Sequence, residues 1–327
     1  MKNTYCDTSL SRRKFLKSSQ SAFLLSLAGC SSLSQLTQAK PLRMGIISDL
    51  HHGLEPTATS RLEAFIAVAN ERKLDCIMQL GDFNFGKPES RECMDSWERF
   101  KGNKYHVLGN HDMDFKTKEQ MLDFWGMPGR YYSFDKNGYH FIVMDRNNLK
   151  TPDGYVHYTN ANFYVDSGMR GHADPEQLEW LRADLESTKL PSIVFMHQGL
   201  GMQDEAYPKG SSKAEVEAVF DSVNRDSGTN RVVACFCGHH HLDRYNIKNG
   251  IHYVWINSAS YYWVGDKYGR MAPYRDPLFA IVSFYPDGLI AIEGRHSAWA
   301  KPTPKERGYP DQESLTTFIS DRTFEVE

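Results

Sequence analysis

From Pro41 onward, short apolar runs of strand length alternate with amphipathic stretches of helix length. The run 76–80 is mostly apolar, as in a strand that is covered on both faces. One amphipathic stretch repeats apolar residues every three to four positions, the spacing of a helix face: Leu62, Phe65, Ile66 and Ala69. The alternation predicts strands at 43–48, 75–80 and 105–108, and helices at 60–73 and 90–100.

The second half of the chain continues this pattern. Two strand-like runs flank Lys136-Asn137-Gly138 and predict a hairpin. Asp174-Pro175 has the cap and first-turn residues of a helix start. Further strands are predicted at 192–196, 232–237, 245–247, 251–257, 280–284 and 289–293, with a helix at 213–223. We expect an α/β fold, a layered sandwich of two mixed β-sheets flanked by helices, in one domain over residues 41–327.

The first thirty residues read as an export signal. Ser11-Arg12-Arg13-Lys14-Phe15-Leu16-Lys17 matches a twin-arginine signal at seven positions and precedes an apolar run, 22–28, that is too short to span a membrane. Leu27-Ala28-Gly29-Cys30 resembles a lipobox, in which cleavage precedes a lipidated cysteine; an ordinary signal with a chance cysteine is the alternative.

These segments predict residues 1–29 as the signal and 30–40 as the lipidated Cys30 with a polar tether. We therefore expect export through the twin-arginine machinery. We also expect periplasmic or cell-surface location and attachment to a membrane through lipid.

Charge and cysteine content argue against a nucleic-acid-binding protein and against a zinc-finger type of site. Loss of residues 1–29 changes the formal net charge from -3 to about -7, because that segment is basic. An acidic protein is poorly suited to a nucleic-acid backbone, and no stable nucleic-acid partner is expected. Cys76, Cys235 and Cys237 lie in apolar runs and are predicted as core residues, and the chain has no Cys-x-x-Cys pair for a zinc-finger type of site.

Three spans exceed the usual length of connections: 146–173, 200–211 and 258–277. We expect them to be loops that face substrate. The first and last are rich in aromatic residues, which either stack on a nucleobase or sugar or pack the loops internally.

Five polar clusters each follow directly on a predicted strand. Strand ends are where α/β proteins place ligands, and glycines beside three of the clusters permit tight turns. Carboxylate, imidazole and carboxamide groups are the donors that a pair of divalent ions requires. The clusters are Asp49-Leu50-His51, Gly81-Asp82, Gly109-Asn110-His111-Asp112, His197 and Gly238-His239-His240-His241.

In this order the clusters resemble the calcineurin-like metallophosphoesterases, over Gly45 to about His241. The resemblance implies that Asp82 bridges two divalent ions. It also implies that Asp49, His51 and His241 hold one of these ions. Asn110, His197 and His239 would hold the other. The position three residues after Asp82 is Phe85, where the purple acid phosphatases carry tyrosine. The chain is therefore more similar to the bacterial phosphodiesterase and phosphatase branch, with Mn, Fe or Zn.

The resemblance also implies a reaction. Two divalent ions about 3.5–4 Å apart activate water to attack phosphorus and stabilise the phosphoryl oxygens. His111 is predicted to protonate the leaving group or hold the phosphate, with Asp112 orienting its ring; a spacer role is the alternative for His111. His240 is expected to contact substrate or solvent, and Arg146 to meet a phosphate oxygen or lie solvated at the surface.

The predicted function is hydrolysis of a small phosphate ester, with a phosphodiesterase favoured over a phosphomonoesterase. A diesterase needs room for a second organic group. A binding or scaffold protein that keeps the fold without metals is a less favoured alternative, because no ligand of the pattern is missing.

Overall fold

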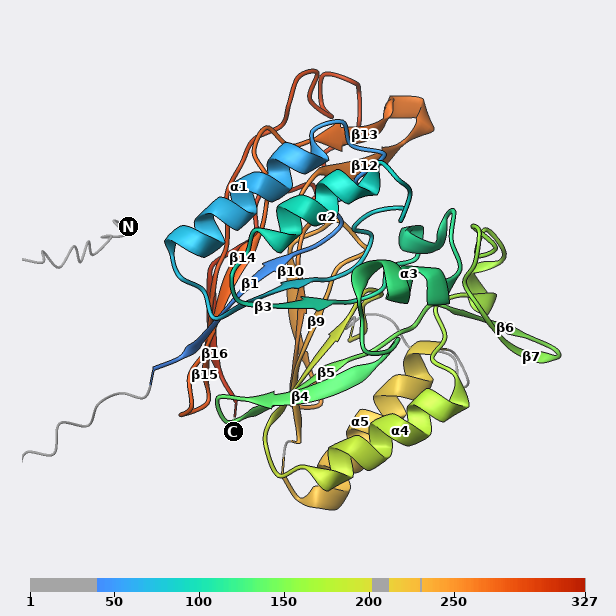
Figure 1. Ribbon diagram of the computed structural model, residues 1–327, viewed down its shortest axis with the longest axis vertical. Coiled ribbons are helices and arrows are strands. Elements are labelled where there is room, and N and C mark those ends of the chain that lie inside the picture. The colour runs from blue at the N-terminus through green and yellow to red at the C-terminus, as the bar shows by residue number, and fades with distance from the viewer. Residues whose placement is uncertain (1–39, 202–211, 230, 327) are drawn as a thin grey trace, which may run out of the picture. The chain divides into compact units, whose positions relative to one another are not determined.

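The computed structural model describes residues 40–201, 212–229 and 231–326 (Figure 1). They belong to one compact unit, Ala39–Glu327. The predicted export signal and Cys30, and most of the span 200–211, lie outside the described residues. No helix in the described ranges has the length and apolar character needed to cross a membrane.

Among the described residues, the first sheet has six strands in the order β16-β15-β14-β1-β2-β3. Strands β1, β2 and β3 are parallel, and β14, β15 and β16 extend the sheet in antiparallel pairs. The bounds are Leu42–Ile47 for β1, Cys76–Gln79 for β2, Asn103–His106 for β3, Ala280–Phe284 for β14, Leu289–Glu293 for β15 and Arg322–Glu325 for β16.

The second sheet, again within the described ranges, has six strands in the order β10-β11-β9-β8-β5-β4. Its centre is parallel, and an antiparallel hairpin partner lies at each edge. The bounds are Tyr132–Lys136 for β4, Tyr139–Val143 for β5, Ser192–Met196 for β8, Val232–Cys237 for β9, Arg244–Lys248 for β10 and Ile251–Trp255 for β11.

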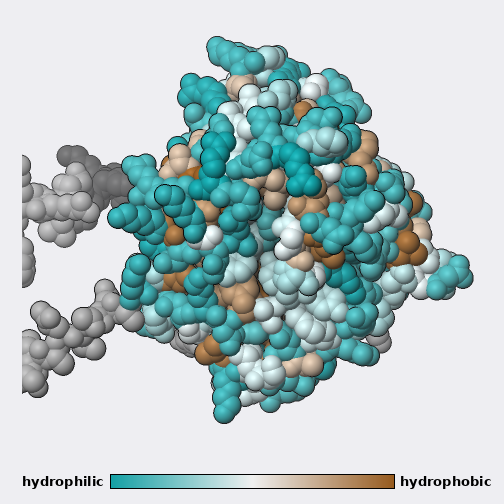
Figure 2. All heavy atoms as spheres, viewed as in Figure 1, coloured by the Kyte–Doolittle hydropathy of each residue, from teal (hydrophilic) through white to brown (hydrophobic). Residues whose placement is uncertain are grey.

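Helices cover the outer face of each sheet. Figure 1 shows α1 (Ala58–Glu71) and α2 (Ser90–Glu98) together on one side, and α4 (Pro175–Ser187) and α5 (Ser212–Ser227) together on the other. The predicted start of α4 is confirmed, since the Asp174 side chain accepts a hydrogen bond from the backbone amide of Gln177. Figure 2 shows a mainly hydrophilic face with small, separate hydrophobic groups.

Strand alternation divides the apolar residues between three cores. Met44 and Ile46 lie in the core between the sheets, together with Phe236. Ile47 of the same strand packs in a second core with Phe65 of α1. A third core joins the second sheet to α4 and α5. Each fully buried large aliphatic or aromatic side chain contributes roughly 1.5–3 kcal/mol, so this layering stabilises the predicted sandwich.

The fold class is confirmed, and Cys76, Cys235 and Cys237 are buried core residues with free thiols. The long spans contain structure that was not predicted. Strands β6 (Asn148–Thr151) and β7 (Gly154–His157) form one small hairpin, and β12 (Tyr261–Gly265) and β13 (Arg270–Pro273) form another. The sequence reading also missed α3 (Lys118–Trp125), which has a capping box at Thr117 and Gln120.

Candidate metal centre

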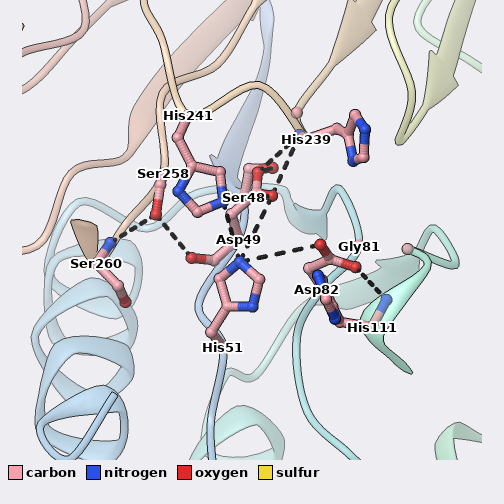
Figure 3. A network of polar contacts seen from close by, with 12 residues as sticks. Ser48, Asp49, His51, Gly81, Asp82, His111, His239, His241, Ser258 and Ser260 are labelled. Carbon is pink, nitrogen blue, oxygen red and sulfur yellow. Dashed lines mark hydrogen bonds and ion pairs between the residues drawn. The ribbon is translucent and has the colours of Figure 1, made fainter. Parts of the chain in front are cut away.

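The predicted ligands meet at one edge of the sandwich, because each follows the carboxyl end of a parallel strand. Possible ligand atoms lie within 4.8 Å of one another inside each of two clusters. Figure 3 shows the side chains of Asp49, His51, Asp82 and His241 converging from loops that are far apart in sequence. The first cluster contains Asp49, His51 and His241, and the second contains Asp82, His197 and His239.

The backbone at the centre adopts an uncommon conformation. Asp49, His51, Asp82, His239 and His241 have positive φ angles of 51°, 52°, 51°, 68° and 51°. For residues other than glycine, the left-handed conformation costs about 1–2 kcal/mol each. Strain of this kind persists where the surrounding structure enforces it, and it is concentrated at functional sites.

Two of the glycines that the sequence marked are required by close packing. A Cβ atom on Gly109 would collide with the backbone amide of Asp82, and one on Gly238 would collide with the Ser48 hydroxyl. Any larger residue at either position would push two ligand-bearing loops apart.

The carboxylate of Asp49 is fixed through both oxygens. Its Oδ2 accepts hydrogen bonds from Ser48 Oγ at 2.5 Å and from the His239 amide at 3.0 Å. The His239 amide also donates to Oδ1 at 3.2 Å. This Oδ1 lies 3.2 Å from Nε2 of His241. Burial alone would raise the pKa of Asp49, but His241 and His197 outweigh it and lower that pKa. Asp49 is therefore ionised, with Oδ1 directed at the first cluster.

The carboxylate of Asp82 lies between the two clusters. Its Oδ1 accepts the backbone amide of His111 at 2.8 Å. Its Oδ2 is 3.1 Å from Nε2 of His197 and 3.9 Å from Nε2 of His51, one imidazole from each cluster. Burial disfavours the ionised carboxylate, yet His197 and His111 hold the pKa of Asp82 well below its usual range.

Backbone carbonyls orient two of the imidazoles. Nδ1 of His197 is 2.7 Å from the Leu80 oxygen, and Nδ1 of His241 is 2.7 Å from the Tyr261 oxygen. With Nδ1 as the donor, Nε2 of each ring points at the centre, as in protein metal sites. Burial disfavours charge on His197, but Asp82 and Asp49 outweigh it and raise the pKa of His197 to about 9, so a cation bound there would displace a proton from Nε2. Burial also lowers the pKa of His51 to about 3, which favours a neutral ring.

Asn110 provides a test of whether these residues fit a metal. Its Oδ1 is buried and has no hydrogen-bond partner among the described residues. A buried amide oxygen without a partner is destabilising, and a cation supplies the missing interaction. The donor set of carboxylates, imidazoles and one carboxamide therefore fits a pair of divalent ions.

The ring of His111 has a different partner from the predicted one. Its Nδ1 lies 3.0 Å from Oδ2 of Asp114, not from Asp112. His111 begins the short 3-10 helix His111–Met113, and side chains three residues apart are aligned in such a turn. That spacing is the sequence signal that could have identified Asp114. Burial disfavours the imidazolium, but Asp82 and Asp114 outweigh it and raise the pKa of His111.

Asp112 instead holds the loops together. Its fully buried carboxylate accepts backbone amides of Gly109 at 2.7 Å, Phe83 at 2.7 Å, Asp82 at 3.0 Å and Asn84 at 3.2 Å. The prediction that it orients the His111 ring is wrong, because all four contacts are with backbone. Asp112 fixes the loop that carries Asp82 against the loop that carries Asn110.

The two residues predicted to bind substrate are placed differently. Arg146 is neither solvated nor at the surface: it is 1% exposed, and its guanidinium donates to the carbonyl oxygens of Gln198 at 2.8 Å and Gly199 at 3.4 Å. Its position gives no support to the predicted phosphate contact. His240 is half-buried, with its ring edge-on to His239 at 5.0 Å, and burial lowers its pKa to about 4.

Aromatic residues of the long spans occur both buried against the ligands and exposed beside the centre. Tyr261 is buried and packs on His51 and His241, at 5.1 Å and 5.0 Å between ring centres. Tyr164 is 65% exposed, with its ring centre 6.4 Å from that of His111. Trp263 lies 6.4 Å from the ring of His51. Tyr164 and Trp263, which belong to the aromatic residues noted in the first and last long spans, thus border the centre.

The chain is similar in sequence to proteins of known families. A model of the family described as calcineurin-like phosphoesterase matches residues 42–243. A relative from Oryza sativa subsp. japonica, a manganese-dependent ADP-ribose/CDP-alcohol diphosphatase, is 23% identical over 239 residues, which cover 62% of this chain and 68% of the relative.

Two solved structures share the fold. A dimetal phosphatase from Danio rerio has a TM-score of 0.60 and 15% identity, covering 88% of this chain and 100% of that one. GAP50, the anchor in the inner membrane complex of Plasmodium, has a TM-score of 0.54 and 15% identity, covering 88% of this chain and 90% of that one.

The family match extends over more than half of the chain and includes both clusters. The chain therefore belongs to the calcineurin-like phosphoesterase family. It is a metal-dependent phosphoesterase.

Proposed function

We propose that this chain hydrolyses phosphodiester-type substrates, in which phosphorus carries two organic or phosphoryl substituents. The observation that carries the proposal is the position of Asp82, whose Oδ2 lies within 3.9 Å of one imidazole from each cluster. A carboxylate in that position can serve two ions at once. Asp49, His51 and His241 would hold one ion, and Asn110, His197 and His239 the other.

When bound, a pair of divalent ions lowers the pKa of water and neutralises charge on the phosphoryl oxygens. The protein's own contribution is to fix the donors before substrate arrives. Ser48 and the His239 amide hold Asp49, and the His111 amide holds Asp82, so neither carboxylate has to reorient.

His111 is proposed to donate the proton that the leaving oxygen needs. Burial disfavours the imidazolium, but Asp82 and Asp114 outweigh it and raise the pKa of His111, which favours the protonated ring that a general acid needs. The carboxylate of Asp114 fixes the ring through Nδ1, which leaves Nε2 as the donor. His111 is 18% exposed in its side chain, so an incoming ester can reach it.

A substrate with two substituents is favoured over a monoester by the borders of the centre. Tyr164 and Trp263 offer ring faces that a second organic group can contact. The similarity to a diphosphatase from Oryza supports the same choice. His240 is proposed as an accessory contact to substrate, and the metals are proposed to be Mn, Fe or Zn, since the donor set suits each of them.

The test compares hydrolysis of bis-nitrophenyl phosphate, nitrophenyl phosphate and ADP-ribose by the purified protein under Mn²⁺, Fe²⁺ and Zn²⁺. We expect the highest kcat/KM for a substrate with two substituents on phosphorus. A preference for nitrophenyl phosphate would establish a phosphomonoesterase instead. Lack of activity together with lack of metal binding would support a scaffold role.

We further propose that the protein is exported through the twin-arginine machinery and anchored to a membrane by lipid on Cys30. The support is the sequence of residues 11–17 and 27–30. Replacing Arg12 and Arg13 with lysine should retain the protein in the cytoplasm. Cys30→Ser should abolish labelling by radioactive palmitate and release the protein from membranes, and unchanged labelling would contradict the anchor.

A further inference from the structure

The β12–β13 hairpin brings a cation to the border of the metal centre. The ring of Trp263 in β12 lies 6.4 Å from the ring of His51 and 6.1 Å from that of His241. The guanidinium carbon of Arg270 in β13 lies over the Trp263 ring, 5.3 Å from its centre. Arg270 is therefore separated from two predicted ligands by a single aromatic ring.

Within the described residues, the guanidinium of Arg270 has no anionic partner. The residue is exposed, and no carboxylate of the described ranges forms an ion pair with it. Two other arginines differ in this respect. Arg61 is buried and donates to the carbonyl oxygens of Ala259 and Tyr274, and Arg146 is occupied by carbonyl oxygens as described above. Of these three, Arg270 alone can offer its fork of donors to an anion.

The backbone of the hairpin holds Arg270 in an unusual conformation. Its φ angle is 64°, which is rare for a residue with a side chain, and the strand register shifts opposite it between Trp263 and Gly265. Bulges of this kind redirect a side chain near active sites. Arg307 fixes the turn by donating to the carbonyl oxygens of Tyr268 at 3.4 Å and Met271 at 2.6 Å.

The chemistry of the centre indicates what Arg270 binds. Asp49, Asp82 and Asp114 make the neighbourhood acidic, and ions held by the predicted ligands would neutralise one phosphoryl group. A second phosphate next to the first would be repelled by these carboxylates unless a separate cation received it. A guanidinium pairs with phosphate through two parallel hydrogen bonds. The stacking on Trp263 keeps the guanidinium in place without neutralising it.

We propose that Arg270, supported by Trp263, binds the second phosphate of the substrate, so that the preferred substrates are diesters of diphosphate. This inference rests on the proposed function of the same site. Hydrolysis adds the hydroxyl of water to one phosphorus and breaks its bond to the bridging oxygen. That oxygen leaves with the second phosphate, which takes the remaining proton or releases it to solvent. Arg270 stabilises the charge of the departing phosphate.

The test measures kcat/KM of the metal-loaded protein for diadenosine diphosphate and for bis-nitrophenyl phosphate, which has a single phosphate. Arg270→Ala should lower kcat/KM for the diphosphate about 10- to 100-fold and change that for the single-phosphate ester less than about 2-fold. Arg270→Lys should give an intermediate value. The matched control is Lys267→Ala, which removes a cation of the same hairpin that lies over Tyr268 at 5.1 Å.

A binding measurement accompanies the kinetics. The dissociation constant of a methylene-bridged diadenosine diphosphate, whose bridge cannot be hydrolysed, should rise in Arg270→Ala by a similar factor and stay constant in Lys267→Ala. Thermal unfolding midpoints of all variants should match that of the original protein. An equal loss for both esters, or no loss for either, would overturn the inference.

Two outcomes separate the inference from the proposed function. Hydrolysis of the single-phosphate ester without hydrolysis of the diphosphate would overturn the inference and leave the function standing. If neither ester is hydrolysed but Arg270→Ala still weakens binding of the bridged analogue, the phosphate site of Arg270 stands and the proposed function fails. Unchanged binding in that case would overturn both.

Discussion

His111 and Asp114 form a partly buried pair, with 3.0 Å between Nδ1 of the imidazole and Oδ2 of the carboxylate. Replacing Asp114 with asparagine removes one of the two carboxylates that raise the pKa of His111. A general acid loses activity as pH rises through its pKa, so the alkaline limb of the kcat profile should move to lower pH in Asp114→Asn. We also expect kcat to fall roughly 10- to 100-fold at neutral pH.

Metal content distinguishes this role from a structural one. Within the described residues no hydrogen bond joins the Asp114 side chain to a predicted ligand, so Asp114→Asn should bind metal as the original protein does. Elemental analysis beside the pH profile provides the check. A variant with normal metal and an unshifted alkaline limb would show that Asp114 does not tune His111.

Unlike Asp114, Asp112 is expected to affect stability and metal content. Its carboxylate accepts four backbone amides from two loops, and asparagine would direct an NH₂ group at some of these donors. Leaving buried amides unpaired costs roughly 1–3 kcal/mol each. Asp112→Asn should therefore lower the free energy of unfolding by about 2–4 kcal/mol and reduce metal content. Urea denaturation measures the first, and full stability with slow turnover would restore the predicted role in orienting His111.

Arg146 is expected to affect stability and not substrate binding. Lysine in its place cannot reproduce the contacts of the planar guanidinium with the carbonyl oxygens of Gln198 and Gly199. Arg146→Lys should reduce stability by about 1–3 kcal/mol. KM should stay within about 2-fold for each substrate. A large increase in KM at an unchanged thermal midpoint would favour the phosphate contact that the sequence indicated.

Stability should depend on pH through His140, which is remote from the ligands in sequence and lies between Asp135 at 2.6 Å and Asp184 at 2.9 Å. Burial disfavours its charge, but the two carboxylates outweigh burial and raise the pKa of His140 in the folded state. Its stabilisation is complete below the unfolded pKa of about 6.5 and is lost as pH rises through the folded pKa.

The variant His140→Gln isolates this effect. We expect the original protein to have a higher free energy of unfolding than the variant. This difference should be larger at about pH 5.5 than at about pH 9, by about 0.5–1 kcal/mol, because the ion pairs are only partly shielded from solvent. Denaturation at the two pH values measures the difference. If the original protein and His140→Gln differed equally in free energy of unfolding at both pH values, or differed more at the higher pH, His140 would not be the source of the pH dependence.

The layers of the fold could be predicted because strand and helix periods are local properties. The run 232–237 is a strand with the same bounds as predicted, and β8, β14 and β15 also agree. The small hairpins could not be found in this way. Strand β13 includes a left-handed arginine and a proline, Arg270 and Pro273, so its extended form depends on pairing with β12 and not on local preference.

The same distinction applies to the site. The ligand pattern follows strand ends, and the side chains of Asp49, His51 and His241 do come together as do those of Asp82, His197 and His239. The hydrogen-bond partners of the residues around the site depend on packing between loops that are distant in sequence. The sequence does not reveal that Asp112 receives amides from residues about thirty positions earlier, or that Arg146 lies under the loop at Gln198.

The proposed mechanism requires that Asp82 bind two ions. The most direct measurement is the number of divalent ions per chain, by elemental analysis after equilibration with Mn²⁺, for the original protein, Asp82→Asn and the control Asp95→Asn on the exposed face of α2. We predict two ions per chain in the original and in the control, and a loss of metal together with activity in Asp82→Asn. Two ions retained in Asp82→Asn would contradict the claim.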